Sequence, residues 1–385
     1  MGSSAAAEIP VLDEPPSYAD FRRDFLEPNR PCLVRGLAEH WSGRQWVHCS
    51  SSKAGPLHPA FAELQRLYAA HTVPLVQPGA AAEDEECRRS ALLPEAIAQL
   101  AKGQRGYIKD WHLVQQLAPG EAPPYTTPDI FADDWMNNVE RGADDFRFCY
   151  AGVQGSGTSL HRDADTSYSW STNLVGRKRW RFFPPESGPG LHRFPDNPTS
   201  ELASSIDDMD ARHARGELGL FKAGKAGWHA WAAVRGSCTE CTQEEGETIF
   251  VPSGWFHDVL NLTDCISLNH NWMNAHNLPS LYASLAQAVD ASAAALSDVE
   301  EQLRATSADE ASWQREWWSI VLQLVAADQG WAWAGFWRIV RRALEHAPCE
   351  ARLRPPDAFT HARVRSCVED FGRRAEAAWV DESTR

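Results

Sequence analysis

The feature that most constrains this chain is a set of two histidines and one aspartate that belong to separate strand-like segments. The stretch Thr158-Ser159-Leu160-His161-Arg162-Asp163 places His161 and Asp163 two residues apart, and His257 follows much later. Side chains at positions i and i+2 lie on the same face of a β-strand, so His161 and Asp163 can bind one metal ion from one side. With His257 they form a 2-His-1-carboxylate triad, which is typical of non-haem Fe(II) oxygenases. The fold must therefore bring two distant segments together.

A lysine stands in an unusual place on a strand that follows the triplet. Residues 167–175 and 178–183 are rich in aromatic and β-branched residues, which predicts two strands. Alternation puts Lys178 on the same face as two aromatic side chains of its own strand, where a charge costs free energy unless an anion pairs with it. Two interpretations stay open. The lysine extends to water from the strand end, or it binds a dicarboxylate cosubstrate beside the metal, to which the Thr158 hydroxyl would also donate.

A third segment combines His257 with a row of polar side chains. Residues 246–262 form a hydrophobic strand, a Pro-Ser-Gly turn and a second strand that carries His257. In the strand that follows, Ser267, Asn269 and Asn271 alternate onto one face. A row of small polar residues that faces inward suits a barrel that holds a polar ligand.

These segments resemble the jumonji-C family of 2-oxoglutarate- and Fe(II)-dependent oxygenases. The T-x-x-H-x-D, G-x-K-x-W and G-E-x-x-F-V-P-x-G-W-x-H elements occur here in the order that the family has. The resemblance covers roughly residues 10–280 and is closest to the subgroup called jumonji domain-containing protein four, through residues 107–112, 148–152, 167–171 and 267–272. It implies a double-stranded β-helix core of the jelly-roll or cupin-like type.

The resemblance also implies the roles of the site residues. His161, Asp163 and His257 would bind Fe(II), Lys178 and Thr158 would bind 2-oxoglutarate, and O2 would be the second cosubstrate. Some relatives have an asparagine on the cosubstrate side of the site, and Ser171 occupies the corresponding position in this chain. The neighbouring asparagines are therefore the cofactor-binding candidates for that contact: Asn173, Asn269 and Asn271.

The subgroup implies an enzyme with a protein substrate. Its members would hydroxylate a lysine carbon of the eukaryotic translation-termination release factor. Two alternatives stay open. One is a histone lysine demethylase or a tRNA-base oxygenase with the same iron chemistry, and the other is a non-catalytic cupin-like binding protein. Specificity would reside in loops such as residues 186–245, which are rich in Gly, Pro, Ser and charged residues.

We expect a mainly β protein with helical flanks. Residues 1–105 form an N-terminal flank of helices and strands that supports the barrel, residues 106–275 form the double-stranded β-helix with the insertion 186–245, and residues 276–385 form a C-terminal helical region. The helical region shows apolar stripes at helical spacing, which predict packing into a core on the same chain or on a second copy in a homodimer. The three stripes are Leu278, Leu281 and Leu285; Trp313, Trp317, Val321 and Leu324; and Trp333, Trp337, Val340 and Leu344.

Composition excludes several function classes. A net charge of −15 argues against general nucleic-acid binding and is compatible with a basic protein substrate. Nine scattered cysteines predict a reducing compartment, and we interpret Cys238-Thr-Glu-Cys241 as thiols in a loop rather than as a zinc site. The sequence has no run of about 18 apolar residues, which predicts no membrane span. We therefore expect a cytoplasmic protein, with the nucleus as the alternative.

Overall fold

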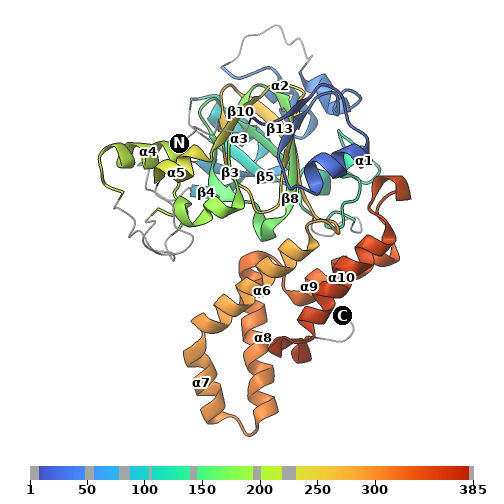
Figure 1. Ribbon diagram of the computed structural model, residues 1–385. Helices are drawn as coiled ribbons and strands as arrows, with labels where there is room; N and C mark the ends of the chain where they lie inside the picture. Colours follow the sequence, from blue (N-terminus) through green and yellow to red (C-terminus); the bar gives the residue numbers. More distant parts are fainter. Residues whose placement is uncertain are drawn as a thin grey trace, which may run out of the picture.

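The computed structural model describes residues 8–47, 56–77, 87–103, 106–138, 145–193, 201–218 and 231–380. The sequence predicts an acidic surface loop at residues 80–87, and its four acidic residues, 83–86, lie outside the described ranges. Figure 1 shows a β-rich body with a group of C-terminal helices that extends from one side of it.

Two sheets form the β-rich body. The larger sheet has the strand order β1-β2-β11-β8-β13-β6-β5-β3-β4, and the smaller has the order β10-β9-β12-β7. The strands of the larger sheet are β1 (Val11–Leu12), β2 (Cys32–Val34), β3 (Thr72–Gln77), β4 (Cys87–Leu92), β5 (Tyr107–Trp111), β6 (Arg147–Gly152), β8 (Tyr168–Val175), β11 (Thr248–Val251) and β13 (Cys265–Trp272). Those of the smaller sheet are β7 (Gly157–Arg162), β9 (Lys178–Phe183), β10 (Thr239–Gln243) and β12 (Phe256–Asn261). This is the mainly β, cupin-like core with helical flanks that the sequence predicts.

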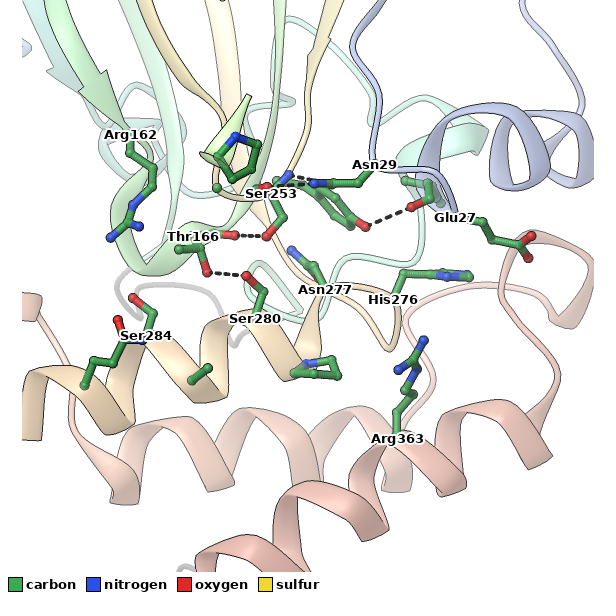
Figure 2. Close-up of a pocket in the computed structure, with 17 residues that line it drawn as sticks. Glu27, Asn29, Arg162, Thr166, Ser253, His276, Asn277, Ser280, Ser284 and Arg363 are labelled. Carbon is green, nitrogen blue, oxygen red and sulfur yellow. Dashed lines mark hydrogen bonds between the residues drawn. The ribbon is translucent and has the colours of Figure 1, made fainter. Parts of the chain in front are cut away.

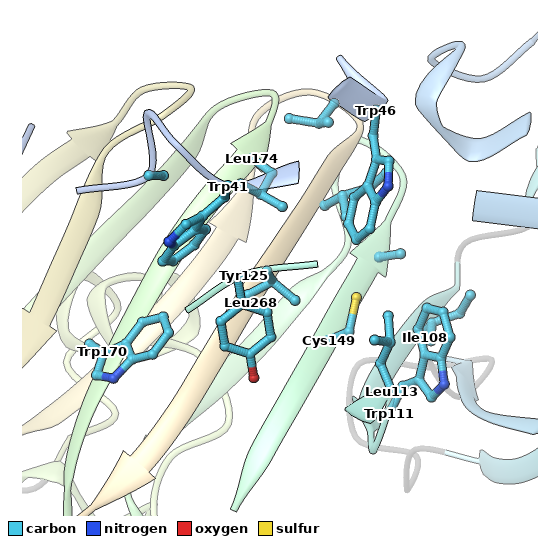
Figure 3. Close-up of a cluster of buried hydrophobic side chains, with 14 of the residues drawn as sticks. Trp41, Trp46, Ile108, Trp111, Leu113, Tyr125, Cys149, Trp170, Leu174 and Leu268 are labelled. Atoms are coloured by element: carbon cyan, nitrogen blue, oxygen red, sulfur yellow. The ribbon is translucent and has the colours of Figure 1, made fainter. Parts of the chain in front are cut away.

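The N-terminal flank covers the outer face of the larger sheet. Every residue of β8 is buried, because its aromatic side chains face the flank while its serines face the other way, into the barrel. Figure 3 shows Trp41 of the N-terminal segment beside β8, the strand that carries Trp170 and Leu174, and Trp46 farther along the same buried cluster. The short strands of the flank also extend the larger sheet, since β2 pairs with β11 and β3 pairs with β5.

Short helices connect these strands. Those before the smaller sheet are α1 (Tyr18–Phe21), η1 (Arg22–Leu26), η2 (Ser42–Trp46), α2 (Ala60–Leu67), α3 (Leu93–Leu100), η3 (Val114–Gln116) and η4 (Asp129–Phe131). Within or beside the smaller sheet lie η5 (Ala164–Thr166), η6 (Pro185–Leu191), α4 (Ile206–Ala214) and α5 (Trp231–Gly236).

The predicted insertion 186–245 differs from the structure at its end. Residues 239–243 form β10, which pairs with β9 along its whole length, so the expectation of a loop around Cys241 is wrong. This segment forms an edge strand in which half-buried and exposed side chains alternate and only Gln243, at its end, is buried. Its polar composition therefore did not indicate a strand. Cys238 and Cys241 are both free thiols.

The C-terminal region is helical as predicted and forms a hydrophobic core of its own. It comprises α6 (Leu278–Ala295), α7 (Ser297–Thr306), α8 (Glu310–Gln329), α9 (Trp333–Glu345), η7 (Ala351–Leu353), α10 (Asp357–Phe371) and η8 (Ala375–Trp379). This core includes Trp135, Met136 and Met273 from the β-rich body, so the helices pack on the same chain. None of the helices in the described ranges is both long and apolar enough to cross a membrane.

Two positions of the predicted apolar stripes are wrong. Leu324 and Leu344 are each 42% exposed, whereas the neighbouring Val325 and Ala343 are buried. A helix turns by 100° per residue, so the last position of a stripe drifts away from the core unless the neighbouring helix follows it. Which of two adjacent apolar residues is buried therefore depends on the helix packing and not on the spacing alone.

Candidate metal and cosubstrate site

The smaller sheet brings the predicted metal ligands together. β12 lies between β7 and β9, and the register pairs His257 with His161 on one side and with Phe182 on the other. Asp163 follows directly after β7. One potential ligand atom from each of His161, Asp163 and His257 lies within 4.8 Å of the other two, and the two imidazole rings are 4.2 Å apart. Two histidines and one carboxylate can thus hold a single ion and leave other coordination positions open.

The groups around the triad orient each ligand toward a metal ion. His161 Nδ1 lies 2.8 Å from the carbonyl oxygen of Ser159 and donates to it, which leaves Nε2 for a metal. The Ser169 hydroxyl donates to Asp163 Oδ2 over 2.7 Å, while Asp163 Oδ1 lies 3.9 Å from His161 Nε2. The donor atoms that remain therefore converge on one point, and the site fits Fe(II).

Burial favours the neutral form of both histidines. It lowers the pKa of His161 to about 4, with a further contribution from His257, and it also lowers the pKa of His257. A histidine must be deprotonated to bind a metal ion, so both rings are in the binding form at neutral pH.

Lys178 lies in the same cavity as the triad and does not extend to water. The cavity is lined by Tyr107, Tyr150, Thr158, His161, Asp163, Ser169, Ser171, Lys178, Trp180, His257, Val259 and Asn269. The Lys178 side chain is 2% exposed, and its Nζ donates to Ser267 Oγ over 2.7 Å. No carboxylate of the described residues pairs with it, and burial lowers its pKa. An ammonium held in this way is suited to a ligand with a carboxylate.

The three predicted asparagines occupy different places. Asn269 lines the cavity, and its amide nitrogen donates to Asn271 Oδ1 over 3.2 Å. Asn271 in turn donates to Ser167 Oγ over 3.1 Å, so it supports Asn269 from behind. Asn173 is fully buried and donates to the carbonyl oxygen of Gly176 at the turn between β8 and β9, outside the group that lines the cavity. Of the three, Asn269 can contact a ligand in the cavity directly.

Two tyrosines of the cavity wall were not predicted as site residues. Tyr107 and Tyr150 lie with ring centroids 5.7 Å apart, and burial raises the pKa of each phenol. The Tyr150 hydroxyl donates to Asp110 over 2.7 Å, and Asp110 also pairs with Arg88 over 3.0 Å. Asp110 has a φ of +57°, at a bulge between β5 and β6. A bulge turns side chains out of the regular alternation, so strand periodicity could not place Asp110 beside the site.

Comparison with known proteins places this site in a family. The family model described as a cupin-like domain matches residues 18–277. The 2-oxoglutarate and iron-dependent oxygenase JMJD4 of Homo sapiens is 35% identical over 298 residues, which are 74% of this chain and 66% of that protein. JMJD4 of Mus musculus is 34% identical over 71% of this chain and 62% of its own length.

A plant relative carries a different name. The arginine-specific demethylase JMJ20 of Arabidopsis thaliana is 34% identical over 286 residues, which are 68% of this chain and 56% of that protein. The chain thus spans between 56% and 66% of the length of these relatives.

Proposed function

The chain belongs to the cupin-like domain family, and from that premise we propose that it is a 2-oxoglutarate- and Fe(II)-dependent oxygenase that hydroxylates a protein side chain. The observation that carries this proposal is the presence of Lys178 in one cavity with His161, Asp163 and His257. A binding protein without catalysis has no need for an unpaired, buried ammonium beside a metal triad.

The charges of the cavity favour a dicarboxylate as the cosubstrate. The two positive charges of Fe(II) and the one of Lys178 are balanced by the single charge of Asp163 and the two of 2-oxoglutarate. Neutrality matters here because uncompensated charges in a buried site cost several kcal/mol. When bound, iron, 2-oxoglutarate and O2 supply the oxidation of a substrate C–H bond.

The residues of the chain bind and orient these groups. His161, Asp163 and His257 would hold the metal, and Lys178 would pair with the distal carboxylate of 2-oxoglutarate. Thr158 and Asn269 line the same cavity and can donate hydrogen bonds to that carboxylate or to the rest of the ligand.

We propose a lysine carbon of the eukaryotic translation-termination release factor as the target. The likeness to the JMJD4 oxygenases and the net charge of −15, which suits a lysine-bearing partner, support this choice. A second candidate, the removal of a methyl group from arginine, is favoured by the likeness to JMJ20, whose name specifies that reaction. Both need the same metal site, so the product must distinguish them.

Two further expectations are proposals as well. We propose a cytoplasmic protein, in line with eight described cysteines that are all free thiols. We also propose a homodimer through the C-terminal helices, supported by the exposed apolar side chains of Leu324 and Leu344.

The test is to incubate the protein with Fe(II), 2-oxoglutarate and ascorbate together with one candidate substrate at a time, and to measure mass shifts. One retained oxygen on a release-factor lysine supports the proposal. Loss of a methyl group from a methylarginine or methyllysine peptide supports a demethylase, and one oxygen on a tRNA base supports a nucleic-acid oxygenase. No modification and no 2-oxoglutarate turnover in the absence of substrate would refute an enzymatic function.

A further inference from the structure

A polar groove lies where the β-rich body meets the C-terminal helices. Its volume is about 460 Å³, and Figure 2 shows that it runs between the loop after β7 and the first turns of α6. We call it the junction groove. Its floor consists of hydroxyl and amide side chains: Asn29, Thr166, Ser253, Asn277, Ser280 and Ser284. Most of these groups already hydrogen-bond one another or the nearby backbone, so the floor is a polar, uncharged and internally fixed surface.

The charged groups of the junction groove are mainly basic. Figure 2 shows Arg162 and Arg363 at opposite ends of it. His276 lies near Arg363 but is neutral at pH 7, because burial lowers its pKa to about 4. Neither arginine forms an ion pair with a described residue; Arg162 lies over the Phe256 ring and Arg363 over the Phe359 ring. The groove therefore offers two guanidinium groups to an anionic ligand.

The remaining charges do not cancel this basic character. Glu27 is the one acidic residue among the described lining residues, and it already pairs with Arg22 over 3.2 Å. The Nε2 atom of His276 is buried and has no hydrogen-bond partner among the described residues. The N-terminus of α6, which starts at Leu278, adds the positive end of a helix dipole.

The junction groove is continuous with the metal-ligand loop. Arg162 stands between His161 and Asp163 in the chain, and Thr166 follows three residues after Asp163. The Thr166 Oγ1 atom lies 2.9 Å from Ser280 Oγ of α6, and its carbonyl accepts a hydrogen bond from the Ser253 hydroxyl. A ligand in the groove thus lies against the segment that carries the metal site.

We propose that the junction groove binds an extended, acidic segment of the protein substrate, outside the residue that enters the metal cavity. This inference rests on the proposed function, because it takes the substrate to be a protein. Two guanidinium groups at opposite ends, with an uncharged polar floor between them, suit a chain with separated carboxylates better than one compact anion. The partner would then carry a basic target residue and an acidic stretch near it.

Binding of a peptide probe tests the proposal without any need for catalysis. The probe is a fluorescein-labelled peptide of four Glu-Ser-Gly repeats, and fluorescence anisotropy measures its Kd for the full chain. We expect Arg363→Glu to raise that Kd by at least about tenfold, because it replaces an attractive charge by a repulsive one. Ser284→Glu, which adds a carboxylate to the floor, should weaken binding in the same direction. The matched control is Arg365→Glu on α10, outside the lining residues, and it should leave the Kd within about twofold of the original.

Three outcomes would overturn the proposal. They are an unchanged Kd in Arg363→Glu, an equal loss in Arg365→Glu, and equal binding of a peptide with Gln in place of Glu. Competition by inorganic phosphate at the concentration of the peptide's carboxylates would show a site for small anions and would also refute a polypeptide groove.

Substrate-independent 2-oxoglutarate turnover separates this inference from the proposed function. Arg363→Glu should retain that turnover and raise only the KM for the protein substrate. A chain that binds the acidic peptide as expected but never turns over 2-oxoglutarate would refute the proposed function and leave the groove as an acidic-peptide site. A chain that turns over 2-oxoglutarate but does not bind the peptide would refute the groove alone.

Discussion

Replacing Lys178 by methionine should have two opposite effects, one on stability and one on cosubstrate binding. The ammonium is 2% exposed and has Ser267 Oγ as its hydrogen-bond partner, without a described carboxylate beside it. A buried charge of this kind costs several kcal/mol, and replacing buried ionic groups by apolar ones is neutral or stabilising by about 1–4 kcal/mol. Methionine has a similar length and no charge, so Lys178→Met should stabilise the protein in the absence of ligand.

The expected change in Tm follows from the size of the chain. Unfolding entropy of about 2 cal/mol/K per residue gives roughly 1 °C per kcal/mol for 385 residues that unfold together. We therefore expect a rise in Tm of about 0–4 °C without 2-oxoglutarate. Losing the charge pair with the cosubstrate costs about 2–5 kcal/mol, so the KM for 2-oxoglutarate should rise by about thirtyfold to several thousandfold. Lys178→Arg should also fail to bind it, because the planar guanidinium is larger than the ammonium.

Thermal unfolding with and without 2-oxoglutarate, under nitrogen with Fe(II), measures both effects in one assay. The Tm of the original chain should rise when 2-oxoglutarate is added. The Tm of Lys178→Met should be higher without 2-oxoglutarate and should rise little when it is added. Lys102→Met, at an exposed lysine, is the matched control and should change neither quantity. A lower Tm in Lys178→Met, together with an unchanged rise in Tm on adding 2-oxoglutarate, would refute the assignment of the cosubstrate carboxylate to this lysine.

Three further changes test other parts of the structure. Asp163→Ala should abolish 2-oxoglutarate turnover and lower bound iron, measured by elemental analysis, with an unchanged circular dichroism spectrum; turnover at the original rate would refute the metal site. Burial raises the pKa of Asp133 to about 7, so its ionisation destabilises the fold progressively as pH rises from about 4 to 7. Asp133→Asn should therefore be more stable than the original at pH 8, by at most about 4 kcal/mol in the free energy of unfolding measured by chemical denaturation. This gain in stability should disappear near pH 4. A gain that did not depend on pH would contradict the ionisation of Asp133 as its cause. Ser280→Ala removes the hydrogen bond to Thr166 Oγ1, which is worth about 1 kcal/mol. It should raise the Kd for Fe(II) several-fold in a metal titration. An unchanged Kd would show that α6 does not position the metal-ligand loop.

Much of the site could be predicted from local periodicity. Strand alternation placed His161 and Asp163 on one side of a strand, and it put Lys178 on a buried face with its aromatic neighbours. It also predicted the inward polar face of β13, where Ser267 contacts Lys178 and Asn269 lines the cavity. The structure agrees with these placements because each involves residues within one strand or, for Asp163, directly after its end, where the side-chain period of two still sets the direction.

Only the tertiary structure decided the features that depend on departures from that period or on neighbours distant in the sequence. Asp110 and Thr166 have positive φ values, so their side chains could not be placed by alternation. The pairing of β10 with β9 depends on hydrogen bonds between strands, which polar composition does not reveal. The junction groove exists because α6 packs beside the metal-ligand loop and α10 packs on α6. Packing between distant segments is set by the shapes of whole surfaces rather than by any single stretch of sequence.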